Sequence, residues 1–107
     1  MTESEFEALA GAALAALESA FEASAPDADV QAKGEGLLEI EFMDGSKMVI
    51  NRHAAAREIW VAAKSGGFHF RHDGSAWRDT RDGTELFAAV SKLASQQSGM
   101  PVILSAR

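Results

Sequence analysis

The spacing of apolar residues changes twice along this chain of 107 residues, and these changes constrain its fold more than any other feature. Over residues 4–23, apolar side chains recur every three or four positions, which predicts an amphipathic helix. Between residues 29 and 78 the repeat shortens to two, which is typical of strands with one buried face. The helical spacing returns at Leu86, Val90 and Leu93. The predicted order is therefore a helix, a set of strands and a second helix.

Tight turns connect the predicted strands, which cover residues 29–33, 38–42, 47–51, 58–62, 68–71 and 76–78. Asp-Gly pairs at positions 44–45 and 73–74 are typical of hairpin turns. Hairpin-linked strands between two helices predict an α+β fold. The expected form is a two-layer sandwich, in which an antiparallel sheet of five to six strands carries the N- and C-terminal helices on one face. The length fits a single domain over residues 1–107.

Local signals predict where the helices begin and end. Ser4 followed by Glu7 predicts a capping box at the start of the first helix. Asp82 followed by Glu85 predicts an Asp cap with the same spacing for the second helix. Gly99 is typical of the residue that ends a helix, because glycine adopts the left-handed conformation without strain.

Alternation along the strands also predicts what the open face of the sheet displays. The outward positions carry mostly polar and basic side chains, namely Lys47, Asn51, Trp60, His69, Arg71 and Arg78. An outward Trp60 among such groups is typical of the aromatic anchors of protein interfaces. The alternative is a register shifted by one residue, which would place Trp60 in the core.

Negative charge is concentrated in the first part of the chain. Residues 1–29 hold seven acidic residues and no Lys or Arg, whereas the remainder is nearly balanced within a net charge of −6. Nucleic-acid binding is not expected, because it requires a basic surface. A cation or a basic protein is the expected partner of the acidic segment. The alternative is a solvated helix face without a partner.

The sequence contains no motif of a catalyst, and we expect no enzymatic activity. The absence of Cys excludes disulfides, thiolate metal sites and a cysteine nucleophile. No serine elbow, P-loop or dinucleotide fingerprint is present. The three His residues do not have the spacing of a paired metal site. Oxygen ligands on an exposed helix would hold a metal only weakly.

No apolar run is long enough to cross a bilayer, and the first residues lack the features of a targeting peptide. A cytoplasmic protein without membrane partners is therefore expected.

Several short strings, in this order and spacing, resemble the frataxin family in its bacterial, CyaY type. They are Asp44-Gly45-Ser46-Lys47 through Ile50-Asn51-Arg52, then Ile59-Trp60-Val61-Ala62, Ser65-Gly66-Gly67-Phe68-His69-Phe70, Trp77-Arg78-Asp79-Thr80-Arg81-Asp82-Gly83 and Gln96-Gln97-Ser98-Gly99. The resemblance implies the same helix–sheet–helix sandwich. It also implies an iron-binding protein of iron–sulfur cluster assembly, acting as an iron donor or as a regulator of the cysteine desulfurase–scaffold complex.

The resemblance further implies two binding surfaces. An acidic ridge would bind Fe²⁺ or Fe³⁺ and dock on a basic patch of the cysteine desulfurase; by position it comprises Glu18, Glu22, Asp27 and Asp29. The sheet face would contact the iron–sulfur scaffold protein; there the implied residues are Asn51 and Trp60, with Arg52 and His69 as further candidates.

This sequence departs from the family pattern in two places. The ridge is thinned, because bacterial relatives tend to carry acids where this chain has Ser19, Ala23, Ala25 and Gln31. Iron is therefore expected to bind weakly. Residues 53–56 read His-Ala-Ala-Ala where Gln and Pro are common.

Two alternative functions remain open from the sequence. One is an iron-storing, ferroxidase-like oligomer, which the thinned ridge disfavours; the other is a protein-interaction module that needs no metal. Without iron, a monomer is expected.

Overall fold

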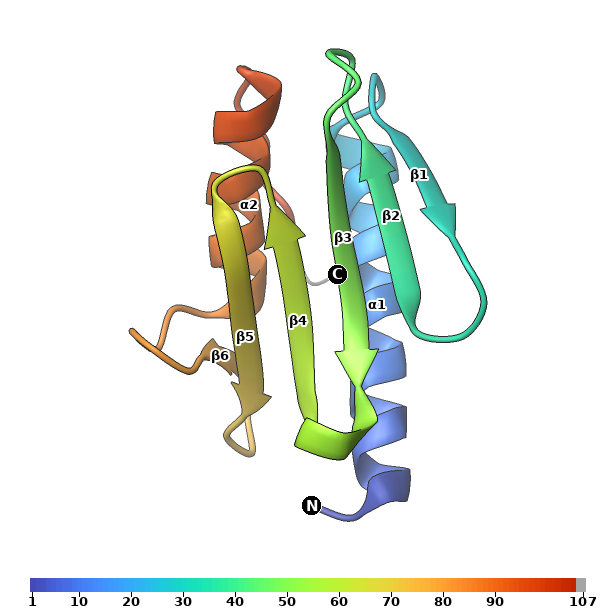
Figure 1. The fold of residues 1–107 in the computed structure, drawn as a ribbon, viewed down its shortest axis with the longest axis vertical. Coiled ribbons are helices and arrows are strands. Elements are labelled where there is room, and N and C mark those ends of the chain that lie inside the picture. The colour runs from blue at the N-terminus through green and yellow to red at the C-terminus, as the bar shows by residue number, and fades with distance from the viewer. Residues whose placement is uncertain (106–107) are drawn as a thin grey trace.

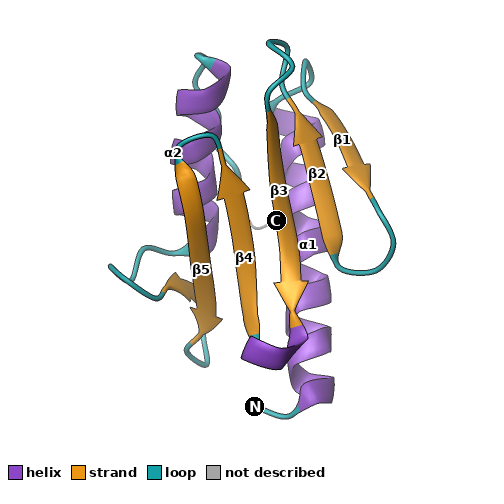
Figure 2. Ribbon diagram, in the orientation of Figure 1, coloured by secondary structure: helices purple, strands orange, loops and turns teal. Residues whose placement is uncertain are grey.

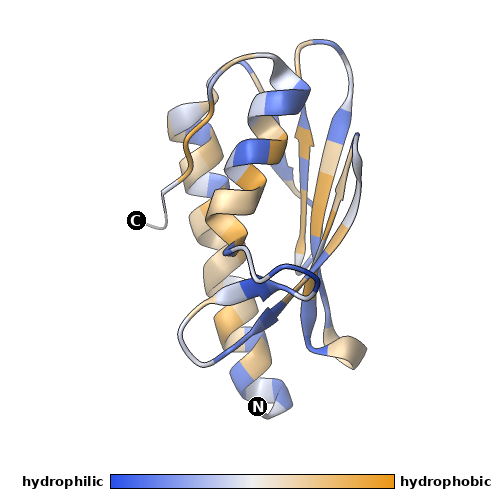
Figure 3. Ribbon diagram, turned by 90° about the vertical axis from the view of Figure 1, so that its left-hand side faces the viewer, coloured by the Kyte–Doolittle hydropathy of each residue, from blue (hydrophilic) through white to orange (hydrophobic). Residues whose placement is uncertain are grey.

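The protein consists of a six-stranded sheet with both helices on one of its faces (Figures 1 and 3). A computed structural model describes residues 1–105. The helices are α1 (Glu3–Ser24) and α2 (Leu86–Ser98), and a short 3-10 helix, η1, covers Ala54–Ala56. The strands are β1 (Asp29–Ala32), β2 (Leu37–Glu41), β3 (Lys47–His53), β4 (Glu58–Ala63), β5 (Gly66–His72) and β6 (Trp77–Asp79).

The strands follow one another across the sheet in chain order, and each pair of neighbours is antiparallel (Figure 2). The predicted two-layer α+β sandwich is therefore confirmed. The other face of the sheet is left open, because both helices lie behind it in Figure 1. Neither helix in residues 1–105 is long and apolar enough to span a membrane.

The core lies between the two layers. The apolar stripe of α1 supplies Phe6, Leu17 and Phe21, all fully buried. They form one cluster with inward residues of the sheet and with α2, including Ile40, Met48, Ile50, Ile59, Phe70, Leu86 and Val90. Burying one such side chain contributes about 1.5–3 kcal/mol, so this cluster fixes which face of each strand turns inward.

The first helix begins two residues earlier than its predicted capping box. Thr2 caps α1: its hydroxyl accepts a hydrogen bond from the backbone N–H of Glu5 (3.1 Å), and the Glu5 carboxylate accepts one from the N–H of Thr2 (2.8 Å). The pair Ser4 and Glu7 has the same spacing but lies inside the helix. The earlier start adds helical hydrogen bonds, including the one from Phe6 N–H to the Thr2 carbonyl (2.9 Å).

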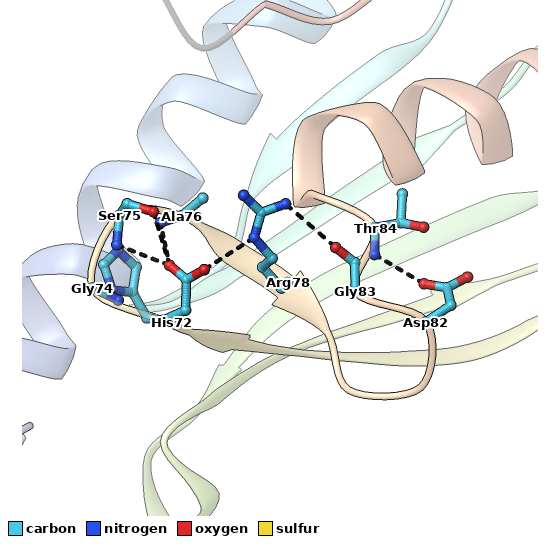
Figure 4. A network of polar contacts seen from close by, with 9 residues as sticks. His72, Gly74, Ser75, Ala76, Arg78, Asp82, Gly83 and Thr84 are labelled. Atoms are coloured by element: carbon cyan, nitrogen blue, oxygen red, sulfur yellow. Dashed lines mark hydrogen bonds and ion pairs between the residues drawn. The ribbon is translucent and has the colours of Figure 1, made fainter.

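The second helix also begins differently from the prediction. The carboxylate of Glu85 caps α2 by accepting hydrogen bonds from the N–H groups of Phe87 (2.8 Å) and Ala88 (3.1 Å). A bridge to Arg78 keeps Glu85 extended beside β6, so the helix cannot begin earlier. Asp82 instead accepts from the N–H of Thr84 in the preceding turn (2.9 Å; Figure 4). The predicted end at Gly99 is confirmed by its φ of 74°.

A polar network fixes the short strand β6 (Figure 4). The Asp73 carboxylate accepts hydrogen bonds from the N–H groups of Ser75 and Ala76 and from Arg78 Nε (3.0 Å). Arg78 also donates to the carbonyl of Gly83 (3.4 Å). The two backbone N–H groups, aided by Arg78, hold the pKa of Asp73 far below its usual range. Arg78 therefore links β6 to the turn before it and to the turn after it.

The cap assignment predicts a difference between two conservative variants. Thr2→Ala should lower the free energy of unfolding by about 1 kcal/mol, because the first turn loses its capping hydroxyl. Ser4→Ala, two residues away on the same helix, should change it little. Urea denaturation of both variants measures this, and an equal loss in the two would contradict the assignment.

Candidate functional site

A row of polar and aromatic side chains crosses the middle of the open sheet face. Asn51, Trp60 and His69 are direct cross-strand partners on β3, β4 and β5. Trp60 turns outward because its neighbours Ile59 and Val61 are 0% and 1% exposed and belong to the core. The alternative register, with Trp60 in the core, is therefore wrong.

Two imidazole rings enclose the indole of Trp60. The ring of His69 on β5 is stacked on it with centroids 4.5 Å apart and an angle of 11° between the planes. The ring of His53, at the end of β3, is stacked with centroids 3.8 Å apart and an angle of 10°. Because β3 and β5 flank β4, the two rings cover opposite faces of the indole. Trp60 therefore presents an edge, and not a face, to solvent.

A buried carboxylate anchors this stack. Glu58 lies two residues before Trp60 on β4 and is 6% exposed. Its Oε1 accepts a hydrogen bond from the indole N–H (2.9 Å) and lies 3.7 Å from His69 Nδ1, while its Oε2 accepts from Arg71. Burial raises the pKa of Glu58, but the donors Trp60 and Arg71 outweigh it and hold this pKa below its ordinary value. A negative charge is thus retained beneath the indole.

Sequence reasoning missed His53 and Glu58 as members of this cluster. Glu58 could have been found from its two-residue spacing to Trp60, which places both side chains on one face. His53 required the register between β3 and β4, because it reaches the indole diagonally from the position opposite Glu58.

Arg52 is not part of the row. It alternates with Asn51 and therefore points to the other side of β3. There it lies beside the β1–β2 loop. Its side-chain Nη2 is 3.5 Å from Glu35 Oε2, and its backbone N–H donates a hydrogen bond to the carbonyl of Gly36 (2.9 Å). The Arg52 side chain also packs so closely on Gly36 that a Cβ at that position would lie 2.6 Å from it. Its predicted role in partner binding stays a prediction.

The predicted acidic ridge follows one edge of the molecule. Glu18 and Glu22 lie on the last turns of α1, and the final turn contains no basic residue. Asp27 lies in the connection after the helix, and Asp29 begins the edge strand β1. Glu22, Asp27 and Asp29 are exposed, whereas Glu18 is half-buried. The carboxylates thus run from the helix layer to the edge of the sheet.

The register adds a fifth carboxylate to this edge. Asp29 is directly opposite Glu41 on β2. Like charges in direct cross-strand pairs repel each other. Lys47 is the cross-strand partner of Glu41 on β3, but its Nζ (3.7 Å), like that of Lys33 (3.0 Å), pairs with Glu39. We refer to Glu18, Glu22, Asp27, Asp29 and Glu41 as the acidic edge.

The acidic edge is not a preformed metal cage. Within residues 1–105, no three His, Asp or Glu side chains lie close enough together to hold a metal ion. The carboxylates are separate or paired, which fits weak and exchangeable binding of a hard cation better than resident coordination.

Comparison with known proteins identifies the family of this chain. A family described as the frataxin-like domain matches residues 1–100. The chain belongs to the frataxin-like family. The six-stranded sandwich is therefore the frataxin fold, in agreement with the resemblance found in the sequence.

Two relatives of this frataxin-like protein are similar over nearly their whole length, and both are named iron-sulfur cluster assembly protein CyaY. The protein from Dechloromonas aromatica is 56% identical over 104 residues, which cover 97% of this chain and 99% of that one. The protein from Cupriavidus metallidurans is 55% identical, with 97% and 96% covered. A solved structure of frataxin from Psychromonas ingrahamii superposes with a TM-score of 0.88 at 30% identity, over 98% of this chain and 99% of that one.

The anchoring role of Glu58 predicts a pH-dependent stability difference. A carboxylate whose pKa is lowered on folding stabilises the fold above its ordinary pKa of 4.5, and loses this contribution as the pH falls through the lowered value. Glu58→Gln should therefore be less stable than the wild type by about 1–2 kcal/mol at pH 7, and the difference should shrink towards pH 3.

Urea denaturation at several pH values measures this difference. Glu7→Gln is the control, since Glu7 is an exposed residue of α1. If Glu58→Gln differs from the wild type in its free energy of unfolding by the same amount at pH 7 and pH 3, the charge of Glu58 does not contribute to stability.

Proposed function

We propose that this protein acts in iron–sulfur cluster assembly as a weak iron binder, donating iron or regulating a cysteine desulfurase–scaffold complex, and catalyses no reaction itself. The observation that carries the proposal is the pair of relatives named as cluster assembly proteins, each more than 50% identical over nearly the whole chain. The acidic edge and the centre of the open sheet face around Trp60 supply two groups of residues for such a role.

The acidic edge suits a basic partner, which we propose is the cysteine desulfurase. Its carboxylates project from α1, the α1–β1 connection and two strands, over a stretch of chain that contains no Lys or Arg before Lys33. Such a field accelerates the approach of a positively charged surface and weakens as salt is added. No deep pocket is needed for this mode of binding.

The open sheet face suits a second protein, which we propose is the scaffold. Asn51 and the edge of the Trp60 indole lie at its centre, and the stack and Glu58 hold the indole rigidly. A rigid aromatic group at the centre of a flat surface loses little conformational entropy on binding.

Iron would be cargo of the acidic edge. Paired carboxylates such as Asp29 and Glu41 repel each other, and a bound cation relieves the repulsion. The lack of three clustered ligands in residues 1–105 also favours the second candidate, an interaction module that needs no metal. The iron experiment below separates the two.

Charge reversal tests the desulfurase surface. The double variant Glu18→Lys and Glu22→Lys should slow association with the cysteine desulfurase by about tenfold or more at low salt, with a smaller effect at high salt. The matched control is Glu3→Lys with Glu7→Lys, which has the same spacing and charge change at the other end of α1. Stopped-flow association rates at two salt concentrations measure the effect. Equal slowing by both variants would contradict a localised surface.

Iron addition tests the cargo proposal. Paramagnetic Fe²⁺ should broaden the amide NMR signals of residues 18–31 and of Glu41, and should leave the first turns of α2 sharp, since only the end of that helix lies near Asp27. Changing Asp29→Asn with Glu41→Gln should remove the broadening at the sheet edge. No broadening at any concentration would favour the metal-independent module. Growth into large particles with iron and air would favour storage.

A further inference from the structure

The two imidazoles that cover Trp60 are held in different ways. His69 lies within β5 as the direct cross-strand partner of Trp60. Its Nδ1 is 3.7 Å from the buried Glu58 carboxylate, which also accepts the indole N–H. The pairing of β4 with β5 and the Glu58 carboxylate together fix His69 on this side of the indole.

The cover on the other side has no polar anchor. His53 Nδ1 is buried and has no hydrogen-bond partner. It is the one buried side-chain nitrogen or oxygen in residues 1–105 without such a partner. A buried polar atom without a partner is unfavourable relative to the same atom in water. Stacking on the indole therefore holds His53 in place against the cost of dehydrating this nitrogen.

The chain that follows His53 is a short, strained turn. His53 is the last residue of β3 and leads directly into η1, which consists of three alanines. Arg57 then adopts a left-handed conformation (φ 55°, ψ 42°), and no other non-glycine residue in the described part of the chain has a positive φ. Backbone strain of this kind is typical of segments that change conformation.

We propose that His53 is a displaceable cover of Trp60. A partner that docks on the sheet face replaces the His53 imidazole with an apolar side chain of its own, while His69 and Glu58 keep the opposite face and the indole N–H fixed. The inference rests on the proposed docking of a partner on this face, and it assigns His53 a role in that docking.

The surroundings of the stack favour an uncharged replacement. Displacement exposes His53 Nδ1 to water and uncovers one apolar face of the Trp60 indole. Arg71 and Arg78 are cross-strand neighbours in the adjacent outward row. The one buried carboxylate near them, Glu58, already accepts from Trp60 and Arg71. Glu58 is paired with Arg71 and Asp73 with Arg78, so neither carboxylate is free to pair with a Lys or Arg of the partner, whereas an apolar side chain on the indole face needs no such partner.

Quenching of Trp60 fluorescence by acrylamide tests the cover in the isolated protein. The signal of Trp60 is separated from that of buried Trp77 by comparison with Trp60→Phe. His53→Ala should raise the quenching constant of Trp60 about twofold, because one of its two covered faces opens. His53→Phe should lower it, because a phenyl ring stacks without a dehydrated nitrogen. Unchanged quenching in His53→Ala would overturn the proposal.

Binding of the iron–sulfur scaffold protein of the same organism, measured by calorimetry, tests the displacement. Relative to the wild type, His53→Ala should bind about threefold tighter or more and His53→Phe weaker by a similar factor, since the cover is absent in one and harder to remove in the other. His69→Ala is the control for the fixed face and should not tighten binding.

Each negative result has a separate meaning. Equal or reversed affinities of the two His53 variants would overturn the displacement. A wild-type chain that does not bind the scaffold would contradict the proposed docking partner, and the quenching result would still decide whether His53 covers the indole.

Discussion

Burial of one sheet face beneath two helices is the constraint on which the other features of this protein depend. The apolar residues of α1 and α2 require apolar side chains on the sheet face beneath them, and Ile59 and Val61 of β4 belong to the same core cluster. Because side chains alternate along a strand, each residue buried by this requirement forces its neighbours outward. The outward position of Trp60 is thus a consequence of core packing, and the open face is available for binding for the same reason.

On the open face, the main interaction is the hydrogen bond between the Trp60 indole and the ionised Glu58 carboxylate beneath it. Glu58 stays ionised because Trp60 and Arg71 donate hydrogen bonds to it, and Trp60 is held in place because Glu58 accepts its N–H. The two effects support each other, as is general in buried networks of hydrogen bonds. A large aromatic side chain at the surface is thereby kept in one orientation.

The acidic edge is organised in the opposite way, with carboxylates that form no ion pair within residues 1–105. Lys33 and Lys47 pair with Glu39, although Lys47 lies opposite Glu41, and the last two turns of α1 carry Glu18 and Glu22 at the end where its dipole is also negative. Such an arrangement costs stability and preserves an attractive field for cations and basic surfaces. Rigid aromatic packing and unpaired charge thus occupy different parts of one small domain.

The sequence by itself determined the fold class and the order of the elements, because these depend on local periodicity and on Asp-Gly turns. It favoured an outward Trp60 but left open a register shifted by one residue. It also determined that negative charge gathers near residues 18–29. It did not determine the caps of the two helices, since equivalent spacings occur at Thr2 and Ser4, and the bridge from Arg78 to Glu85 forms only in the folded chain. The stack of His53, Trp60 and His69 and the pairing of Asp29 with Glu41 join residues from different strands. Only the tertiary structure decided them, because register and side-chain stacking depend on how separate strands align, and no local pattern specifies that alignment.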